Sequence, residues 1–177
     1  MRIVINNYNL KIKYLTEFIS KVKAILIDNN NNILLGNYNG TLLLPGGKIE
    51  GNETFLDAMI RELKEETGVI YSYDDLSFFG TVDYYQKDYP FKGSYKNRFV
   101  FTCYFVGKFK GIDCDNMQLS DCEIKNNFNL ELIPLDNIEN TILFNPTKNP
   151  YNRFQRNELL KVISAYKNEN KLCRKRK

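Results

Sequence analysis

Residues 47–69 of the chain read GKIEGNETFLDAMIRELKEETGV. Their apolar residues recur at helical spacing, which predicts an amphipathic helix over residues 54–67. Gly68 is suited to end this helix, because glycine adopts the left-handed conformation at little cost. The apolar stripe consists of Leu56, Met59, Ile60 and Leu63. One face of the helix is therefore expected to lie in a core, while the acidic residues lie on the other.

Three of these acidic residues, Glu62, Glu65 and Glu66, stand at positions i, i+3 and i+4 of the helix. Their side chains share one face within about one turn, where like charges repel. Solvent, protonation or a bound cation can relieve such a cluster. Taken alone, it is more often an ordinary solvated helix face, with Lys64 nearby. The acids by themselves therefore do not decide between a surface and a metal site.

The sequence before the helix favours a cation. A short strand over residues 41–44 is followed by Pro45-Gly46-Gly47, where proline ends the strand pairing and the glycines let the backbone approach a ligand closely. The helix N-terminus that follows offers unpaired N–H groups to an anion. Carboxylate oxygens suit Mg²⁺, with Mn²⁺ as an alternative. Loop, helix and acids together predict a site that holds a diphosphate against a divalent metal.

Residues 47–69 also match every fixed position of the Nudix box, G-x5-E-x7-R-E-U-x-E-E-x-G-U, in which U is a bulky aliphatic residue. Leu63 and Val69 fill the two aliphatic places. This motif is long and very specific, although it covers a small part of the chain. By it, the protein resembles the Nudix hydrolase family. The resemblance implies an α/β fold, with an α/β/α sandwich around a mixed β-sheet. It also implies hydrolysis of a nucleoside diphosphate linked to another moiety.

The resemblance assigns roles to individual residues of the box. It implies that Glu62, Glu65 and Glu66 are metal ligands, and that the backbone carbonyl of Gly47 is an additional one. Metal-assisted attack of water on a phosphorus atom requires a base that removes the proton of the water. Glu62 or Glu65 is expected to be this catalytic base.

Four further residues have expected roles around these ligands. Glu53 and Arg61 match the pair that braces the loop against the helix, and an arginine two helical turns beyond a glutamate can hold it by an ion pair. In the family the base sometimes lies in a loop beyond the box. Asp121 and Glu123 therefore remain alternative candidates for it.

Substrate contacts are less well defined by the sequence. Many Nudix proteins carry a basic residue at the end of the strand before the box, whereas this chain reads Gly36-Asn37-Tyr38 there. The candidates for stacking on a substrate base are Tyr38, Tyr84 and Tyr85. Core packing explains a tyrosine in such an aromatic strand more readily than stacking does.

Composition excludes several classes of protein. The 177-residue chain has no histidine, which removes imidazole-based mechanisms and the usual zinc hydrolase sites. No apolar run approaches the ~18 residues of a membrane span, and the first residues lack the pattern of a signal peptide. We therefore expect a cytoplasmic protein with reduced thiols at Cys103, Cys114, Cys122 and Cys173.

The rest of the sequence predicts a mixed sheet with helices packed on it. A β-hairpin is expected over residues 21–28 and 33–35, further strands over 76–85, 97–107 and 130–133, a short helical turn over 135–138 and a closing amphipathic helix over 153–168. A polar stretch over residues 88–93 is expected to join the two long strands. The length predicts a single domain over residues 1–170, followed by a basic, disordered tail over 171–177.

The sequence thus leads to one main hypothesis and two alternatives. The main hypothesis is a Mg²⁺-dependent hydrolase of a nucleoside triphosphate, a dinucleoside polyphosphate or a nucleotide sugar. The basic tail and the aromatic residues keep an RNA 5′-end pyrophosphohydrolase as an alternative, with RNA as its partner. A non-catalytic Nudix module that only binds a nucleotide is the other, although such modules usually lose a box glutamate. A homodimer is compatible with the sequence.

Overall fold

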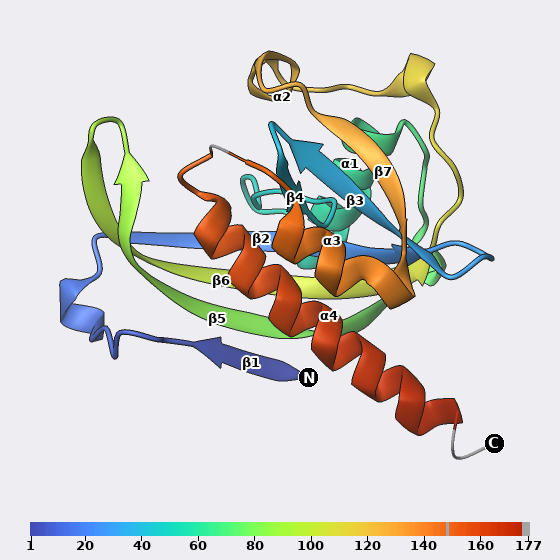
Figure 1. Ribbon diagram of the computed structural model, residues 1–177. Coiled ribbons are helices and arrows are strands. Elements are labelled where there is room, and N and C mark those ends of the chain that lie inside the picture. Colours follow the sequence, from blue (N-terminus) through green and yellow to red (C-terminus); the bar gives the residue numbers. More distant parts are fainter. Residues whose placement is uncertain (148, 175–177) are drawn as a thin grey trace.

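A seven-stranded mixed sheet forms the centre of the structure, a computed structural model that describes residues 1–147 and 149–174 (Figure 1). The strands follow the order β1-β5-β6-β2-β3-β4, and β7 also pairs with β3. They are β1 Arg2–Ile5, β2 Glu17–Ile27, β3 Asn32–Tyr38, β4 Thr41–Leu43, β5 Leu76–Phe91, β6 Ser94–Lys108 and β7 Asn129–Pro134. β1 runs parallel to β5 and β2 parallel to β6, and the other pairs of described strands are antiparallel.

Helices cover both faces of this sheet. They are α1 Phe55–Thr67, α2 Asp121–Lys125, α3 Ile138–Phe144 and α4 Asn152–Arg174, with short 3-10 turns η1 Ile12–Tyr14, η2 Tyr73–Asp75, η3 Cys114–Asn116 and η4 Leu135–Asn137. In Figure 1, α3 and α4 cross one face of the sheet and α1 lies behind the other. The predicted α/β/α sandwich with a mixed β-sheet is confirmed. No helix in the described ranges has the length and apolar character needed to cross a membrane.

Each face of the sheet has its own apolar core. Val22 and Ala24 of β2 are buried together with Leu63 of α1. Ile25, the next residue of β2, belongs to the opposite core, which it shares with Leu159 of α4. Because successive side chains of a strand point to opposite faces, the odd and even residues of β2 serve different layers of the molecule.

The hairpin of β5 and β6 is longer than we expect from its sequence. The polar stretch over residues 88–93 was predicted to be a loop, but most of it belongs to the strands. Asp88 takes a φ of 51° next to a register shift, so that a bulge absorbs the irregularity and the ladder continues. Only Lys92 and Gly93, which both have positive φ, form the turn.

The two ends of the chain also differ from the prediction. β1, which no strand prediction includes, pairs in parallel with β5 through Arg2 and Thr81. At the other end, α4 continues to Arg174, so residues 171–174 of the expected disordered tail have a helical backbone. Residues 175–177 of that tail lie outside the described part of the chain.

Gly68 ends α1 as predicted, with a left-handed φ of 72° and an N–H that donates to the carbonyl of Lys64. A Cβ atom added here would lie 1.9 Å from the carbonyl oxygen of Asp113, which belongs to the segment packed against the end of α1. Replacing Gly68 by alanine therefore combines a left-handed backbone with a steric clash. We expect a loss of about 3 kcal/mol or more in the free energy of unfolding.

Gly93→Ala provides the matched control for this prediction. Gly93 has a similar φ of 77°, but no atom lies within 4 Å of an added Cβ. Its replacement should cost about 1 kcal/mol, the backbone contribution alone. Urea denaturation of both variants measures the difference, and equal losses would contradict the role given to the contact with Asp113.

Candidate active site

The start of α1 is fixed by a capping box, which sets the phase of every side chain that follows. The Thr54 hydroxyl accepts the N–H of Asp57 at 3.2 Å, and the Asp57 carboxylate accepts the N–H of Thr54 at 3.3 Å. The Tyr73 hydroxyl also donates to Asp57. Because α1 begins at a defined residue, the positions of its acidic side chains relative to the preceding loop are fixed.

The three glutamates of α1 differ in exposure. Glu62 and Glu66 are buried, with 8% and 3% of their surface exposed, whereas 36% of the Glu65 side chain is exposed. Glu66 Oε2 accepts the backbone N–H of Gly46 at 2.8 Å. The acids and the glycine loop that the sequence predicted to act together are therefore in direct contact.

Arg61 holds this cluster together from one side. Its guanidinium contacts both carboxylate oxygens of Glu53, at 3.1 and 2.8 Å. Its Nη1 lies 3.0 Å from Glu62 Oε1 and 3.2 Å from Glu65 Oε2. Its Nη2 also donates to the carbonyl of Lys48 at 3.0 Å. One planar cation thus joins the loop, the brace residue Glu53 and two of the acids.

Gly47 leaves space that the Glu62 carboxylate fills. A Cβ atom at this position would lie 2.3 Å from Glu62 Oε1, so any larger residue would displace the acid. The Gly47 carbonyl accepts the N–H of Val22 at 3.0 Å, which fastens the loop to β2. A carbonyl oxygen has two lone pairs, and the second remains available to a ligand.

Burial makes the ionised forms of these acids costly. It raises the pKa of Glu62 to about 7, against the opposing effect of Arg61, with smaller contributions from the negative charges of Glu65 and Glu123. Burial also raises the pKa of Glu66 well above its ordinary value, and the Gly46 N–H opposes this shift. A cation placed among these carboxylates would favour their charged forms.

The donor set fits a divalent cation. Buried carboxylates beside a backbone carbonyl, in a cradle that admits no side chain at Gly47, are the ligands that Mg²⁺ prefers. Within the described ranges, however, no three acidic or thiol groups already surround a point that a metal could occupy. Two of the acids, Glu62 and Glu65, are paired with the Arg61 guanidinium.

The two alternative bases lie in α2, which comes from a distant part of the sequence. Glu123 is near enough for its charge to raise the pKa of both Glu62 and Glu66. Its carboxylate caps α2, accepting the N–H of Ser120 at 2.7 Å. Asp121, the first residue of α2, is exposed, and it is not among the main causes of either shift in pKa. The structure therefore brings Glu123, rather than Asp121, close to the box.

Tyr38 joins the end of β3 to α2. Its hydroxyl accepts the side-chain amide of Asn126 at 2.9 Å and lies 2.9 Å from the Sγ atom of Cys122. Burial, followed by the contact with Cys122, raises the pKa of this tyrosine. Tyr38 thus lies at the edge of the region where Glu123 approaches the box.

Tyr84 and Tyr85 lie on opposite faces of the sheet. Tyr84 is buried in the core beneath α4, where its hydroxyl accepts the side-chain amide of Asn157 at 3.0 Å. Tyr85 points to the other side and packs edge-on against Phe99, with 5.0 Å between ring centroids. The two tyrosines therefore do not line one common pocket.

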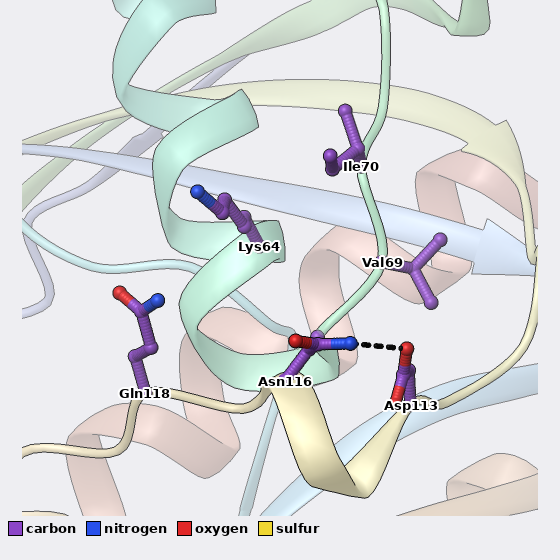
Figure 2. A pocket seen from close by; sticks show the side chains of 7 residues that line it. Lys64, Val69, Ile70, Asp113, Asn116 and Gln118 are labelled. Atoms are coloured by element: carbon purple, nitrogen blue, oxygen red, sulfur yellow. Dashed lines mark hydrogen bonds between the residues drawn. The ribbon is translucent and has the colours of Figure 1, made fainter.

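A cavity of about 540 Å³ lies at the C-terminal end of α1 (Figure 2). Among its lining residues, Asn116 donates to the Asp113 carboxylate at 2.7 Å. Lys64 also lines it and stands two residues after Glu62, which places it on roughly the opposite side of the helix. This cavity is therefore separate from the acidic site.

The raised pKa of Glu62 predicts how pH affects stability without metal. In the unfolded chain this carboxyl group ionises near its ordinary pKa of 4.5, and in the folded protein near 7. The folded state therefore binds more protons between these values, and its free energy of unfolding falls as pH rises through them. Glu62→Gln lacks this titration. We therefore expect its free energy of unfolding, relative to that of the native chain, to rise by at most roughly 3 kcal/mol over that pH interval. Denaturation in chelator at a series of pH values measures the difference, and parallel pH profiles would contradict the prediction.

The chain belongs to the NUDIX family, since the model of the NUDIX domain matches residues 18–153. A segment of 48 residues is 46% identical to an ADP-ribose pyrophosphatase of Methanocaldococcus jannaschii. That segment makes up 27% of this chain and 26% of the relative, so the match spans only about a quarter of the relative's length.

Solved structures of NUDIX proteins show the same fold. A NUDIX hydrolase from Nitrosomonas europaea superposes with a TM-score of 0.57 at 19% identity, covering 85% of this chain and 89% of that one. The NUDIX domain of NrtR from Shewanella oneidensis, solved in complex with ADP ribose, gives a TM-score of 0.55 at 17% identity, with 91% and 94% covered. At these identities the likeness concerns the fold alone.

Proposed function

We propose that this protein is a Mg²⁺-dependent pyrophosphohydrolase that cleaves the diphosphate of a nucleoside diphosphate linked to another moiety. The observation that carries the proposal is the packing of two buried glutamates, Glu62 and Glu66, against the Gly46-Gly47 loop. Buried acids of raised pKa are costly to fold, and a divalent cation bound with a phosphate chain would stabilise them.

In this proposal the glutamates Glu62, Glu65 and Glu66 hold the metal, with the carbonyl of Gly47 as a further ligand. A bound Mg²⁺ neutralises negative charge that develops on the phosphate oxygens. Arg61 holds the loop and, through its contacts with Glu53, fixes the loop's position relative to the acids. Because Arg61 shares its charge between Glu62 and Glu65, it also maintains both carboxylates near their working positions in the metal-free protein.

The same carboxylates are suited to accept the proton of water. As the water oxygen forms a bond to phosphorus, the bond to the bridging oxygen breaks, and one proton passes to a carboxylate. Glu65 is the most accessible of the three and is our first candidate for this base. Glu123, which lies within electrostatic range of Glu62 and Glu66, is the alternative.

The substrate that we propose to test first is of the nucleotide-sugar type. The partial relative is named an ADP-ribose pyrophosphatase, and the NUDIX domain of NrtR was solved with ADP ribose. Nucleoside triphosphates and dinucleoside polyphosphates contain the same scissile linkage and belong in the same test.

A product screen with and without Mg²⁺ tests the proposal. Its panel contains ADP-ribose, other nucleotide sugars, nucleoside triphosphates, dinucleoside polyphosphates and 5′-triphosphorylated RNA. We expect Mg²⁺-dependent release of two phosphate-bearing products from at least one soluble nucleotide. Cleavage of RNA alone would favour an RNA 5′-end pyrophosphohydrolase. No cleavage of any compound by the native chain would favour a NUDIX module that binds nucleotides without reacting.

A further inference from the structure

Three cations lie on the face of the sheet that α4 covers. Lys21 and Lys23 of β2 share this face with Ile25, because alternate residues of a strand point the same way. Arg98 of the neighbouring β6 lies on the same side, where its guanidinium stacks 3.6 Å from the ring centre of Tyr89. The sequence pattern Lys-Val-Lys at the start of a buried strand is the only sign of this group in the sequence.

Two of the three cations have partners within the protein. Lys23 Nζ lies 3.6 Å from Glu158 Oε2, and both side chains are buried beneath α4. Arg98 Nε lies 3.5 Å from Glu17 Oε2. Neither ion pair is close enough to be a good hydrogen bond, and Arg98 Nε and Glu17 Oε2 have no hydrogen-bond partner in the described part of the chain.

Lys21 differs from the other two because its side chain has no hydrogen bond or ion pair to any described residue. It is half-buried, and its surroundings are cationic. Burial lowers the pKa of Lys21 to about 8, and the positive charges of Lys23, Arg98 and Lys48 add to this effect against that of Glu158. A lysine ammonium in such a place lacks the anion that would normally balance it.

The backbone of Lys21 lies next to the loop of the candidate active site, although its side chain points to the face that α4 covers. Lys21 forms an isolated β-bridge with Lys48, whose carbonyl accepts Arg61 Nη2 at 3.0 Å. The next residue of β2, Val22, donates to the carbonyl of Gly47 at 3.0 Å. The loop that we propose to face the diphosphate therefore runs alongside β2, and Gly47 is hydrogen-bonded to the residue between Lys21 and Lys23.

We propose that Lys21, with Lys23 and Arg98 beside it, binds a further phosphate group of the substrate, in addition to the diphosphate that is cleaved. The inference rests on the proposed function for the identity of the substrate. Its support is geometric: an ammonium without an ion pair to any described residue, two cations whose ion pairs to described residues are those with Glu158 and Glu17, and a loop whose backbone connects them to the acids. A phosphate offers the negative charge and the several acceptor oxygens that these three cations lack.

Pairs of substrates that differ by one phosphate test this proposal. We compare ADP with ATP, and ADP-ribose with its 2′-phosphate, in the native chain and in Lys21→Met, Lys21→Arg and Lys108→Met. Lys108 is an exposed lysine at the end of β6 and is the matched control. In at least one pair the extra phosphate should lower KM about tenfold, and Lys21→Met should abolish that preference with little change in kcat. Lys21→Arg should retain most of it, and Lys108→Met all of it.

A binding measurement separates this inference from the proposed function. In chelator, inorganic tripolyphosphate should bind the native chain and Lys108→Met alike, and Lys21→Met about tenfold more weakly, as measured by calorimetry. If no compound is hydrolysed but this difference appears, the phosphate site stands and the proposed function falls. If hydrolysis occurs but Lys21→Met changes neither KM preference nor tripolyphosphate binding, the inference is overturned. Thermal melting of each variant, with Lys21→Arg as a second variant, identifies any loss of folding.

Discussion

Replacing Glu65 by glutamine is expected to lower kcat by about 10²-fold or more, with almost no change in melting temperature. The Glu65 side chain is partly exposed, and its one ion pair to a described residue is the contact with Arg61 at 3.2 Å. Its removal therefore costs little stability, since exposed pairs contribute at most about 1 kcal/mol. The negative charge that is lost is needed only to bind a cation or to accept a proton in the site. Steady-state kinetics on the best substrate of the product screen measures the effect.

Glu50→Gln is the control for this variant. Glu50 lies in the loop before α1 and is exposed, and its side chain makes no hydrogen bond or ion pair to any described residue. Its replacement should leave both kcat and melting temperature unchanged. Full activity in Glu65→Gln would remove Glu65 from the metal site and from the candidates for the base, and full activity in Glu66→Gln as well would refute the proposed function.

Arg61→Lys should be the most damaging conservative substitution in the chain. Arginine here makes contacts with Glu53, Glu62, Glu65 and the carbonyl of Lys48 at once. The ammonium of lysine is a point charge and cannot span these partners. We expect a loss of roughly 2–4 kcal/mol in the free energy of unfolding, because one ammonium leaves some of these partly or fully buried acids without a cationic partner. Activity should fall as well, since the loop and the acids are no longer held together.

Arg2→Lys provides the comparison. Arg2 also contacts a carboxylate, that of Asp83, with Nη2 2.6 Å from Oδ2, but 74% of the Arg2 side chain is exposed. The same change of residue should there cost at most about 1 kcal/mol. Chemical denaturation of the two variants in parallel measures the contrast. Similar losses would show that the Arg61 contacts act as an ordinary surface pair.

The sequence predicts those parts of the structure that depend on local patterns. The helical spacing of apolar residues, the left-handed glycine at position 68 and the position of the acids opposite the glycine loop are all present. The bracing of Glu53 by Arg61 also follows, because both lie within one short segment whose geometry a helix determines. These features need no knowledge of distant residues.

What the sequence does not predict depends on pairing between distant segments. β1 forms only because the edge of β5 is available for pairing. The sequence of α2 is too short to show a helical periodicity. The helical turn expected over residues 135–138 continues as α3 to Phe144 for the same reason. The approach of Glu123 to Glu62 and Glu66 is likewise a tertiary effect, since α2 follows the box by a long stretch of chain.

The two faces of β2 suggest how such a protein can change its selectivity. Even-numbered residues of this strand support α1 and the acids that we propose to carry the reaction, whereas Lys21 and Lys23 face the layer beneath α4. Alternate positions of one strand can therefore be varied independently. A library limited to Lys21 and its neighbours on the same face should yield enzymes with new substrate preferences and an unaltered reaction, which makes β2 the natural starting point for engineering.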